Sequence, residues 1–407
     1  MGFVLRNVGP LGFVLWNVGP LGFVLWNVGP LGFVLRNVGP VGFVFRKVSF
    51  VFRKGSAMRL RASLAAVPLM LLAVSGCDSA GPPSAEAISC APGTVAGQGS
   101  SAQANAVSAW IKNYQVSCAD ATISYSSVGS GAGVTAFIGG SGDFAGTDSA
   151  LSAADQPRAA QRCGSAAIHL PMVVGPIALA YNVAGVDSLR LSPATVAQIF
   201  GGRITRWNDA AVARDNPGVA LPATPVRTVH RSDKSGTTDN FTKFLAGAAG
   251  ENWSYGSGSA WPAPGGVAAL GSNRVVSTIE RADGAIGYVE ASYARFHDLP
   301  TARVGNAAGD FVGLTDEAAG LMVAGARVTG TGGDLQLSVD YKSAVAGAYP
   351  LVLVTYEVVC QRGTGPLAKS FLGYAASPAG QEAAVQLGYA PLPEALREKV
   401  VGAVAAL

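Results

Sequence analysis

Short apolar runs alternate with stretches of helical periodicity along most of this chain of 407 residues. Apolar and polar residues alternate from Ile123 to Val128, which is typical of a half-buried strand. Longer apolar runs predict buried strands at 172–182, 285–289 and 351–359. The first of these runs contains Gly175-Pro176, and we expect that pair to break the strand.

Helical segments lie between and after these strands. Ser192 and Pro193 precede the run ATVAQIF, which ends at Gly201, and this order predicts a helix with a serine cap, an early proline and a terminal glycine. Residues 366–375 predict another helix after the last strand. Strands that alternate with helices indicate an α/β fold, and the 330 residues after position 77 are enough for two lobes.

A repeat of ten residues fills positions 2–51, where five near-copies of GFVLRNVGPL follow one another. A strand plus a turn could stack at this period, but the Asn-Val-Gly-Pro punctuation excludes a membrane-spanning helix. The copies are nearly identical and end just before Met58. We therefore interpret residues 1–57 as sequence upstream of the native protein.

From Met58 the chain has the features of an exported lipoprotein. Arg59 and Arg61 precede an apolar run that is too short to span a membrane, as in a secretory signal peptide at 58–77. The small residues before Cys77 resemble a bacterial lipoprotein box, which implies that Cys77 is lipidated. Residues 78–88 are rich in Ser, Ala, Gly and Pro and suit a flexible tether.

The charge distribution argues against nucleic-acid binding. The net charge is +4, but eight of the 29 Lys and Arg residues lie within residues 1–77, which contain no acidic residue. The rest of the chain therefore has 21 basic and 25 acidic residues. A nucleic-acid-binding protein needs a basic face on its folded domain, and nothing in this distribution supports one.

The cysteines beyond position 77 are even in number, as expected for two disulfides in an exported protein. They are Cys90, Cys118, Cys163 and Cys360, and three pairings are possible. No CxxC pair occurs among them, so the sequence predicts no zinc site and no other metal cluster.

Three stretches rich in glycine and hydroxyl side chains each follow a predicted strand and precede a predicted helix. They lie at 97–102, 129–133 and 230–238. The start of a helix offers unpaired N–H groups and the positive end of the helix dipole, so it can bind an anion. Three such turns, one of them carrying Arg231, favour an anion-binding protein.

Catalytic motifs are a poorer match. The P-loop pattern, the dinucleotide fingerprint GxGxxG and the hydrolase pattern GxSxG are absent. His230 is the one plausible base among the three histidines, and its place at a strand end beside Arg231 favours a structural role. Read locally, Asp148 is more simply a helix cap than a functional carboxylate.

The order of these segments resembles the PstS-type phosphate-binding lipoproteins, which serve a high-affinity phosphate ABC importer. The resemblance covers about residues 90–400 and is most specific at 129–152, 200–209 and 230–245. It implies a periplasmic-binding-protein fold with two α/β lobes, two hinge crossings near 173–175 and 348–351, and a ligand cleft between the lobes. Lobe I would comprise 89–174 and 349–407, and lobe II 175–348. The same topology implies the disulfides Cys90–Cys118 and Cys163–Cys360.

The resemblance also assigns phosphate contacts by position. They are Ser101, Ala102, Ser130, Asp148, Arg231, Ser235, Gly236 and Thr237, with Asp233 orienting Arg231. The family often has threonine and phenylalanine where this chain has Ser101-Ala102, a change that keeps the donors and removes an aromatic flank. Asp148 would accept the proton of a phosphate O–H, which sulfate lacks.

The implied function is capture of inorganic phosphate and its delivery to the permease subunits of an ABC importer. The resemblance implies a monomer without cofactor or catalysis, held by its lipid on the outer face of the cytoplasmic membrane. Three alternatives stay open: a receptor for another oxyanion such as sulfate or molybdate, a secreted phosphatase or esterase, and a structural surface lipoprotein.

Overall fold

The computed structural model describes residues 3–7, 13–17, 23–27, 33–37 and 88–407. The chain divides into two compact units, residues 1–79 and 80–407. The predicted signal peptide at 58–77, the lipidation site Cys77 and all but the last residue of the predicted tether lie outside the described residues. Among the described residues, no helix has both the length and the apolar character needed to cross a membrane.

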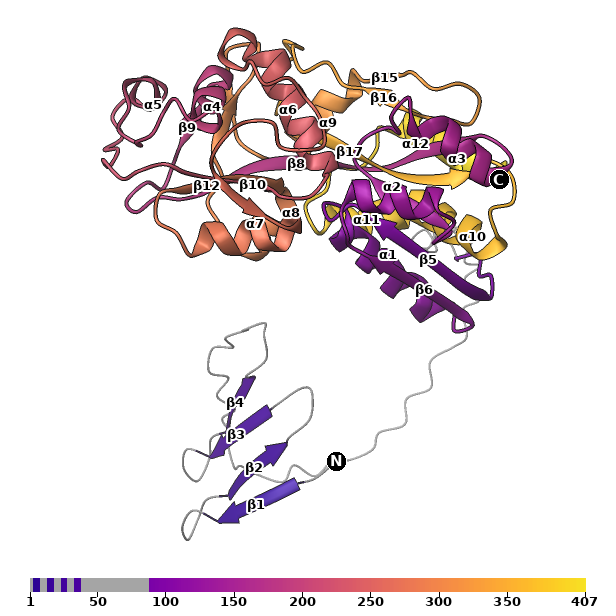
Figure 1. Cartoon of the computed structure of the whole chain (residues 1–407). Coiled ribbons are helices and arrows are strands. Elements are labelled where there is room, and N and C mark those ends of the chain that lie inside the picture. The colour runs from indigo at the N-terminus through magenta and orange to yellow at the C-terminus, as the bar shows by residue number, and fades with distance from the viewer. Residues whose placement is uncertain (1–2, 8–12, 18–22, 28–32, 38–87) are drawn as a thin grey trace, which may run out of the picture. The chain divides into compact units, whose positions relative to one another are not determined.

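Each of the first four decamers forms one strand of a small antiparallel sheet (Figure 1). The strands follow chain order as β1 (Phe3–Asn7), β2 (Phe13–Asn17), β3 (Phe23–Asn27) and β4 (Phe33–Asn37). The interpretation that residues 1–57 precede the native protein stays a prediction.

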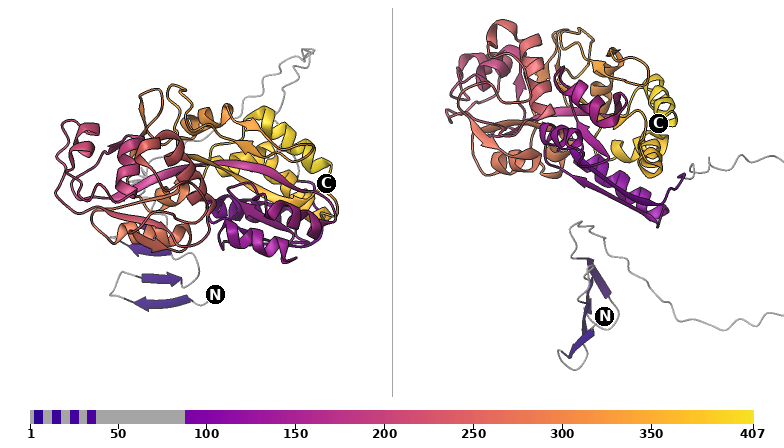
Figure 2. Two further views of the ribbon diagram at one scale, coloured as in Figure 1. Left: turned by 45° about the horizontal axis from the view of Figure 1, so that its top comes forward. Right: turned by 45° about the vertical axis from the view of Figure 1, so that its right-hand side comes forward.

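The second unit is built on one mixed sheet of eight strands, in the order β11-β10-β12-β8-β17-β7-β5-β6 (Figures 1 and 2). In chain order these strands are β5 (Gly93–Gly99), β6 (Ala121–Ser126), β7 (Phe144–Thr147), β8 (Ala167–Asn182), β10 (Arg227–Arg231), β11 (Val267–Ala269), β12 (Ala285–Glu290) and β17 (Val352–Cys360). Smaller sheets join β9 (Arg190–Leu191), β13 (Arg303–Gly305) and β14 (Phe311–Val312), and β15 (Arg327–Val328) with β16 (Leu337–Ser338).

The prediction that Gly175-Pro176 breaks a strand is wrong, because β8 runs unbroken for 16 residues. Up to Pro176, β8 pairs with β17, and from Ile177 onward it pairs with β12. Pro176 lies where β8 changes partner from β17 to β12. Proline has no backbone N–H, but at this position neither set of inter-strand hydrogen bonds has to continue through it. We call β6, β5, β7, β17 and residues 167–176 the first half-sheet, and residues 177–182 with β12, β10 and β11 the second half-sheet.

Helices cover both half-sheets, and one of them, α6 (Gly236–Ala248), contacts strands of both, β12 and β17. The first packs against α1 (Ala104–Ser117), α2 (Ser130–Ile138), α3 (Asp155–Cys163), α10 (Pro366–Ala376) and α12 (Glu394–Ala405), with α11 (Pro378–Val385) on α1 and α10. The second half-sheet packs against α6 (Gly236–Ala248), α7 (Gly271–Glu280) and α8 (Ala291–Phe296), with α4 (Pro193–Phe200) on α6. The remaining helices are α5 (Ala210–Asp215), a 3-10 turn (Gly250–Asn252) and α9 (Asp316–Ala324).

These elements confirm the predicted α/β fold and most of the predicted helices and strands. Ser192 caps α4 by accepting a hydrogen bond from Thr195 N, as its sequence predicts. The predicted lobe boundaries stay a prediction. The change of partner within β8 falls close to the first expected hinge crossing, and this supports it.

The core lies on both faces of the long central strands. All residues of β17 and nearly all of β8 are buried. In the first half, Tyr114 of α1 meets the ring of Phe371 of α10 edge-on, with ring centroids 5.8 Å apart. Burial of each large apolar side chain stabilises such a core by about 1.5–3 kcal/mol.

Two disulfides close the first half of this unit, and both predicted pairings are confirmed. Cys90 is bonded to Cys118, and Cys163 is bonded to Cys360 across 197 residues of chain. The second bond joins the end of α3 to the last residue of β17. Because a bond that closes so long a loop lowers the conformational entropy of the unfolded chain, it stabilises the folded state.

Two glycines inside helices provide a test of this packing. A Cβ on Gly133 of α2 would lie 2.4 Å from Gly99 Cα and 2.5 Å from the Gln98 carbonyl oxygen. A Cβ on Gly320 of α9 would meet no atom within 4 Å. We expect Gly133→Ala to lower the free energy of unfolding by about 2 kcal/mol or more through overpacking. We expect Gly320→Ala to raise it by about 0.5–1 kcal/mol through backbone entropy.

Urea unfolding of both variants measures the two effects. Equal changes in the two variants would contradict close packing of α2 against the end of β5.

Candidate functional site

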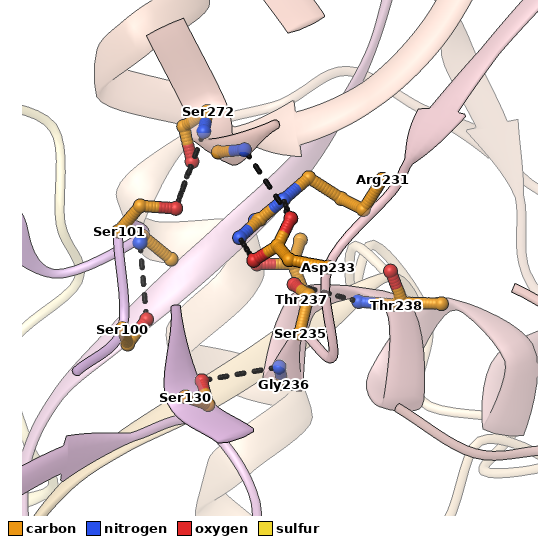
Figure 3. A network of polar contacts seen from close by, with 12 residues as sticks. Ser100, Ser101, Ser130, Arg231, Asp233, Ser235, Gly236, Thr237, Thr238 and Ser272 are labelled. Atoms are coloured by element: carbon orange, nitrogen blue, oxygen red, sulfur yellow. Dashed lines mark hydrogen bonds and ion pairs between the residues drawn. The ribbon is translucent and has the colours of Figure 1, made fainter. Parts of the chain in front are cut away.

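All three glycine- and hydroxyl-rich stretches connect a strand to the start of a helix, as predicted. The first follows β5 and leads into α1, the second follows β6 and leads into α2, and the third follows β10 and leads into α6. Two of these turns belong to the first half-sheet and the third to the second half-sheet. Figure 3 shows that they face one another across a small polar region.

The starts of α2 and α6 touch each other directly. Gly236 N donates to Ser130 Oγ at 3.1 Å, and Thr237 Oγ1 lies 3.4 Å from Asp148 Oδ2. A Cβ on Gly236 would lie 2.6 Å from the Cβ of Asp148, so only glycine lets α6 start this close to the aspartate. The structure therefore brings together residues that are up to 107 positions apart in the sequence.

Asp148 lies at the centre of these contacts, one residue beyond the end of β7. Its side chain is 2% exposed, with Ser130 Oγ 3.5 Å from Oδ2. Oδ1 is buried and has no hydrogen-bond partner among the described residues. Burial raises the pKa of Asp148 to about 6, although a hydrogen bond from Ser100 and the charge of Arg231 oppose the rise. A helix-cap role does not fit, because α3 begins only at Asp155.

Asn240 holds the backbone of this aspartate. Its Nδ2 donates to the Asp148 carbonyl at 2.7 Å and to the Gly236 carbonyl at 2.9 Å. Tyr341 in turn donates to Asn240 Oδ1 at 2.8 Å. The first turns of α6 therefore fix the position of Asp148 from the second half-sheet.

Arg231 supplies the cation of the site and is 2% exposed. Its Nε donates to Asp233 Oδ1 at 2.8 Å and its Nη2 to Oδ2 at 2.5 Å, a two-pronged contact that fixes the plane of the guanidinium. Burial alone would raise the pKa of Asp233, but Arg231 and the N–H of Gly271 outweigh it and hold the pKa below its ordinary value. Both Nε and Nη2 are engaged by this contact with Asp233.

The remaining predicted contacts belong to the first and third turns. Ser101 Oγ is 2.9 Å from Ser272 Oγ, and the Ala102 N–H donates to Ser100 Oγ at 3.0 Å. Ser235 Oγ accepts from Thr238 N and caps α6. The N–H groups of Ala102 and Gly236, both predicted as ligand donors, are thus bonded within the protein.

Several residues around the site escaped the sequence analysis. Ser100 lies inside the predicted first turn, directly before the predicted contact Ser101, so its position could have identified it. Asn240 lies three residues after Thr237 in the same helix, so its nearness to a predicted residue could have identified it. Three others carry no local signal, because they come from elements far from the first turn in the chain: Ser272, Tyr293 and Tyr389.

His230 and Lys234 lie away from this constellation. His230 Nδ1 is 3.0 Å from the carbonyl oxygen of Arg231, and its ring stacks on Trp261 with centroids 5.1 Å apart. Lys234 is exposed. Among the described residues, no group of three or more His, Cys, Asp or Glu side chains could hold a metal ion. The arrangement combines one buried cation, several donors and one acceptor, which suits an oxyanion that carries a proton.

The raised pKa of Asp148 predicts a pH-dependent stability in the absence of added anion. Since its folded pKa of about 6 lies above the ordinary 3.8, the folded protein retains a proton that the unfolded chain releases between these values. This stabilisation is complete below about pH 4 and is lost as the pH rises through 6. We expect the free energy of unfolding of wild type, relative to Asp148→Asn, to fall by about 3 kcal/mol between pH 4 and 7.

Denaturant unfolding at several pH values measures this difference, and the exposed Asp120→Asn variant is the control. A difference that stays constant with pH would contradict the buried state of the Asp148 carboxyl.

Comparison with known proteins identifies the family. The PBP superfamily domain matches residues 84–379. The chain is 43% identical over 318 residues to phosphate-binding protein PstS2 of Mycobacterium bovis, covering 76% of this chain and 86% of that relative. It is 39% identical over 333 residues to phosphate-binding protein PstS 3 of Mycobacterium leprae, covering 80% and 90%.

Solved structures show the same fold. A periplasmic phosphate-binding protein (PfluDING) bound with phosphate aligns with a TM-score of 0.62 at 23% identity, covering 76% of this chain and 93% of that chain. A phosphate-binding protein from Stenotrophomonas maltophilia aligns with a TM-score of 0.60 at 21% identity, with the same coverage. The predicted periplasmic-binding-protein fold is thereby confirmed. With relatives of this identity along most of its length, the chain belongs to the PstS family of phosphate-binding proteins.

Proposed function

We propose that this protein captures inorganic phosphate outside the cytoplasm and delivers it to the permease subunits of an ABC importer. One observation carries the proposal: a buried carboxylate oxygen, Asp148 Oδ1, has no hydrogen-bond partner among the described residues, while hydroxyls of Ser130 and Thr237 approach the other oxygen, Oδ2. The relatives named as phosphate-binding proteins and the solved structure bound with phosphate support it.

The protonation of phosphate explains why an aspartate belongs in this anion site. Phosphate keeps at least one O–H at neutral pH, and that hydrogen can be donated to Asp148 Oδ1. With a pKa of about 6, Asp148 is ionised at neutral pH and can accept it. Sulfate has no such hydrogen, so its charge would face a like charge without a compensating bond. A buried polar group left unpaired in this way can discriminate by about 10⁴–10⁵.

The remaining groups satisfy the other phosphate oxygens. Arg231, held flat by Asp233, offers its outward N–H groups. The hydroxyls of Ser101, Ser130 and Thr237 converge on the same region, and the start of α6 adds the positive end of its dipole. Each charge-assisted hydrogen bond contributes roughly 1.5–3 kcal/mol, which offsets the desolvation of the buried anion.

The other functions considered from the sequence fit less well. A receptor for sulfate or molybdate would be repelled by the Asp148 carboxylate. A phosphatase or esterase needs a nucleophile beside a base, but the His230 ring bonds to the Arg231 carbonyl and stacks on Trp261. Turnover of a chromogenic phosphate monoester, lost in the Ser130→Ala variant, would instead favour an enzyme.

The same proposal includes the way the protein is held at the membrane. Export by residues 58–77, lipidation of Cys77 and a tether at 78–88 would place a monomeric receptor on the outer face of the cytoplasmic membrane. Mass analysis of the N-terminal peptide from the membrane-bound protein tests the start at Met58 and the lipid on Cys77.

The role of Asp148 predicts a change in anion selectivity. In Asp148→Asn the acceptor charge is lost and an amide N–H becomes available, so phosphate should bind at least about 100-fold more weakly while sulfate binding increases. Titration calorimetry of residues 78–407 with both anions measures the two affinities, with Asp120→Asn as the control. Equal affinity of the wild type for phosphate and sulfate would exclude this role.

The role of Arg231 predicts that its removal weakens phosphate binding, whereas removal of a nearby exposed cation does not. Removal of the buried guanidinium in Arg231→Ala should weaken phosphate binding by about 2–5 kcal/mol, and Arg231→Lys should recover part of this because it keeps the charge. The exposed Lys234→Ala is the matched control and should bind within about twofold of the wild type. Thermal unfolding verifies that each variant is folded, and unchanged affinity in Arg231→Ala would place the anion elsewhere.

A further inference from the structure

Helix α7 begins beside the site although no predicted ligand contact belongs to it. The helix packs on β10 and β12 in the second half-sheet. Its first N–H group, on Gly271, donates to Asp233 Oδ1 at 3.2 Å, and the next, on Ser272, donates to Ser101 Oγ at 3.2 Å. The first N–H groups of a helix have no partner within it, and here two of them meet residues of the proposed phosphate site (Figure 3).

The pair formed by Ser101 and Ser272 is buried and doubly bonded. Their side chains are 3% and 1% exposed, and the two hydroxyl oxygens lie 2.9 Å apart. Ser101 Oγ already accepts from the Ser272 N–H. The bond between the hydroxyls uses one of their two protons, so the pair keeps one proton for another acceptor.

A tyrosine of a helix on the second half-sheet, the half that carries Ser272, bonds to the backbone of the first turn. Tyr293 of α8 donates from its hydroxyl to the Ser101 carbonyl oxygen at 2.6 Å. Ser272 and Tyr293 are 171 and 192 residues from Ser101 in the sequence. The side chain and the carbonyl of Ser101, a residue of the first half, are therefore both bonded by groups from the second half.

We propose that Ser272 positions the Ser101 hydroxyl as a phosphate donor, an inference that rests on the proposed function. Ser272 donates its N–H to Ser101 Oγ, and either hydroxyl can donate in the bond between the two serines. In the proposed arrangement Ser272 donates its O–H as well, which turns the Ser101 proton toward the anion. A hydroxyl that accepts hydrogen bonds is polarised and donates more strongly. Because the two serines come from different half-sheets, this donor is aligned only while the halves are together.

Alignment across the two halves has a kinetic consequence. Without the Ser272 hydroxyl, phosphate still encounters the same charges, so its association rate should change little. Such a variant lacks one hydrogen bond that holds the halves together and one aligned donor to phosphate. The halves should therefore separate more readily, and phosphate should dissociate faster than from the wild type.

The experiment uses variants of residues 78–407, measured by titration calorimetry and by stopped-flow dissociation of phosphate. Ser272→Ala should bind phosphate about tenfold more weakly, through faster dissociation. Ser277→Ala in the same helix, whose hydroxyl donates to the Arg274 carbonyl at 3.3 Å, is the matched control. Ser272→Thr keeps the hydroxyl and should restore most of the affinity, which separates its role from folding.

A double-mutant cycle shows whether Ser272 acts through Ser101. In a Ser101→Ala background, the further change Ser272→Ala should have almost no effect on phosphate affinity, since the hydroxyl that it orients is already absent. Additive losses, or wild-type affinity and dissociation rate in Ser272→Ala, would overturn the inference while the proposed function stands. A wild-type protein that binds no phosphate would overturn the proposed function, and this inference with it.

Discussion

The Asp148 carboxylate is 2% exposed, and a charge in such a place is stable only where donors surround it. Much of the site can be understood as a response to that constraint. Ser130 and Thr237 approach one carboxylate oxygen, Arg231 contributes an opposite charge, and Asn240 holds the backbone. The other oxygen has no partner among the described residues. The proposed phosphate site is therefore suited to an anion that brings its own proton.

Helix starts can surround a carboxylate only if the chain lets them approach closely. Gly236 places the start of α6 against Asp148, where any side chain would collide with the Cβ of the aspartate. Arg231 ends β10 just before this helix, so the same turn brings the guanidinium and the N–H groups to one place. Asp233, between Arg231 and the helix in the chain, takes the two-pronged contact and fixes the plane of the guanidinium.

Sheet topology divides these groups between two halves of the molecule. Only β8 pairs with both β17 and β12, so it joins the half that carries Ser101, Ser130 and Asp148 to the half that carries Arg231 and α6. The bonds across the site, such as those from Gly236 to Ser130 and from α7 to Ser101, link the same two halves a second time. In the proposed function, an anion bound between the halves would therefore add to bonds that already hold them together.

Residues 97–102, 129–133 and 230–238 were enough to predict the three turns, and the resemblance to a family implied the fold, the disulfide pairs and a set of site residues. These features are local, since a strand end, a glycine and a capped helix start follow one another within a few residues. The continuation of β8 through Pro176 was missed because it depends on which strand lies alongside. Ser272 and Tyr293 were missed for the same reason: they reach Ser101 from 171 and 192 residues away, and contacts at such separations leave no periodicity in the sequence. The sequence by itself thus determined the turns that can bind an anion, and only the tertiary structure decided which residues orient them.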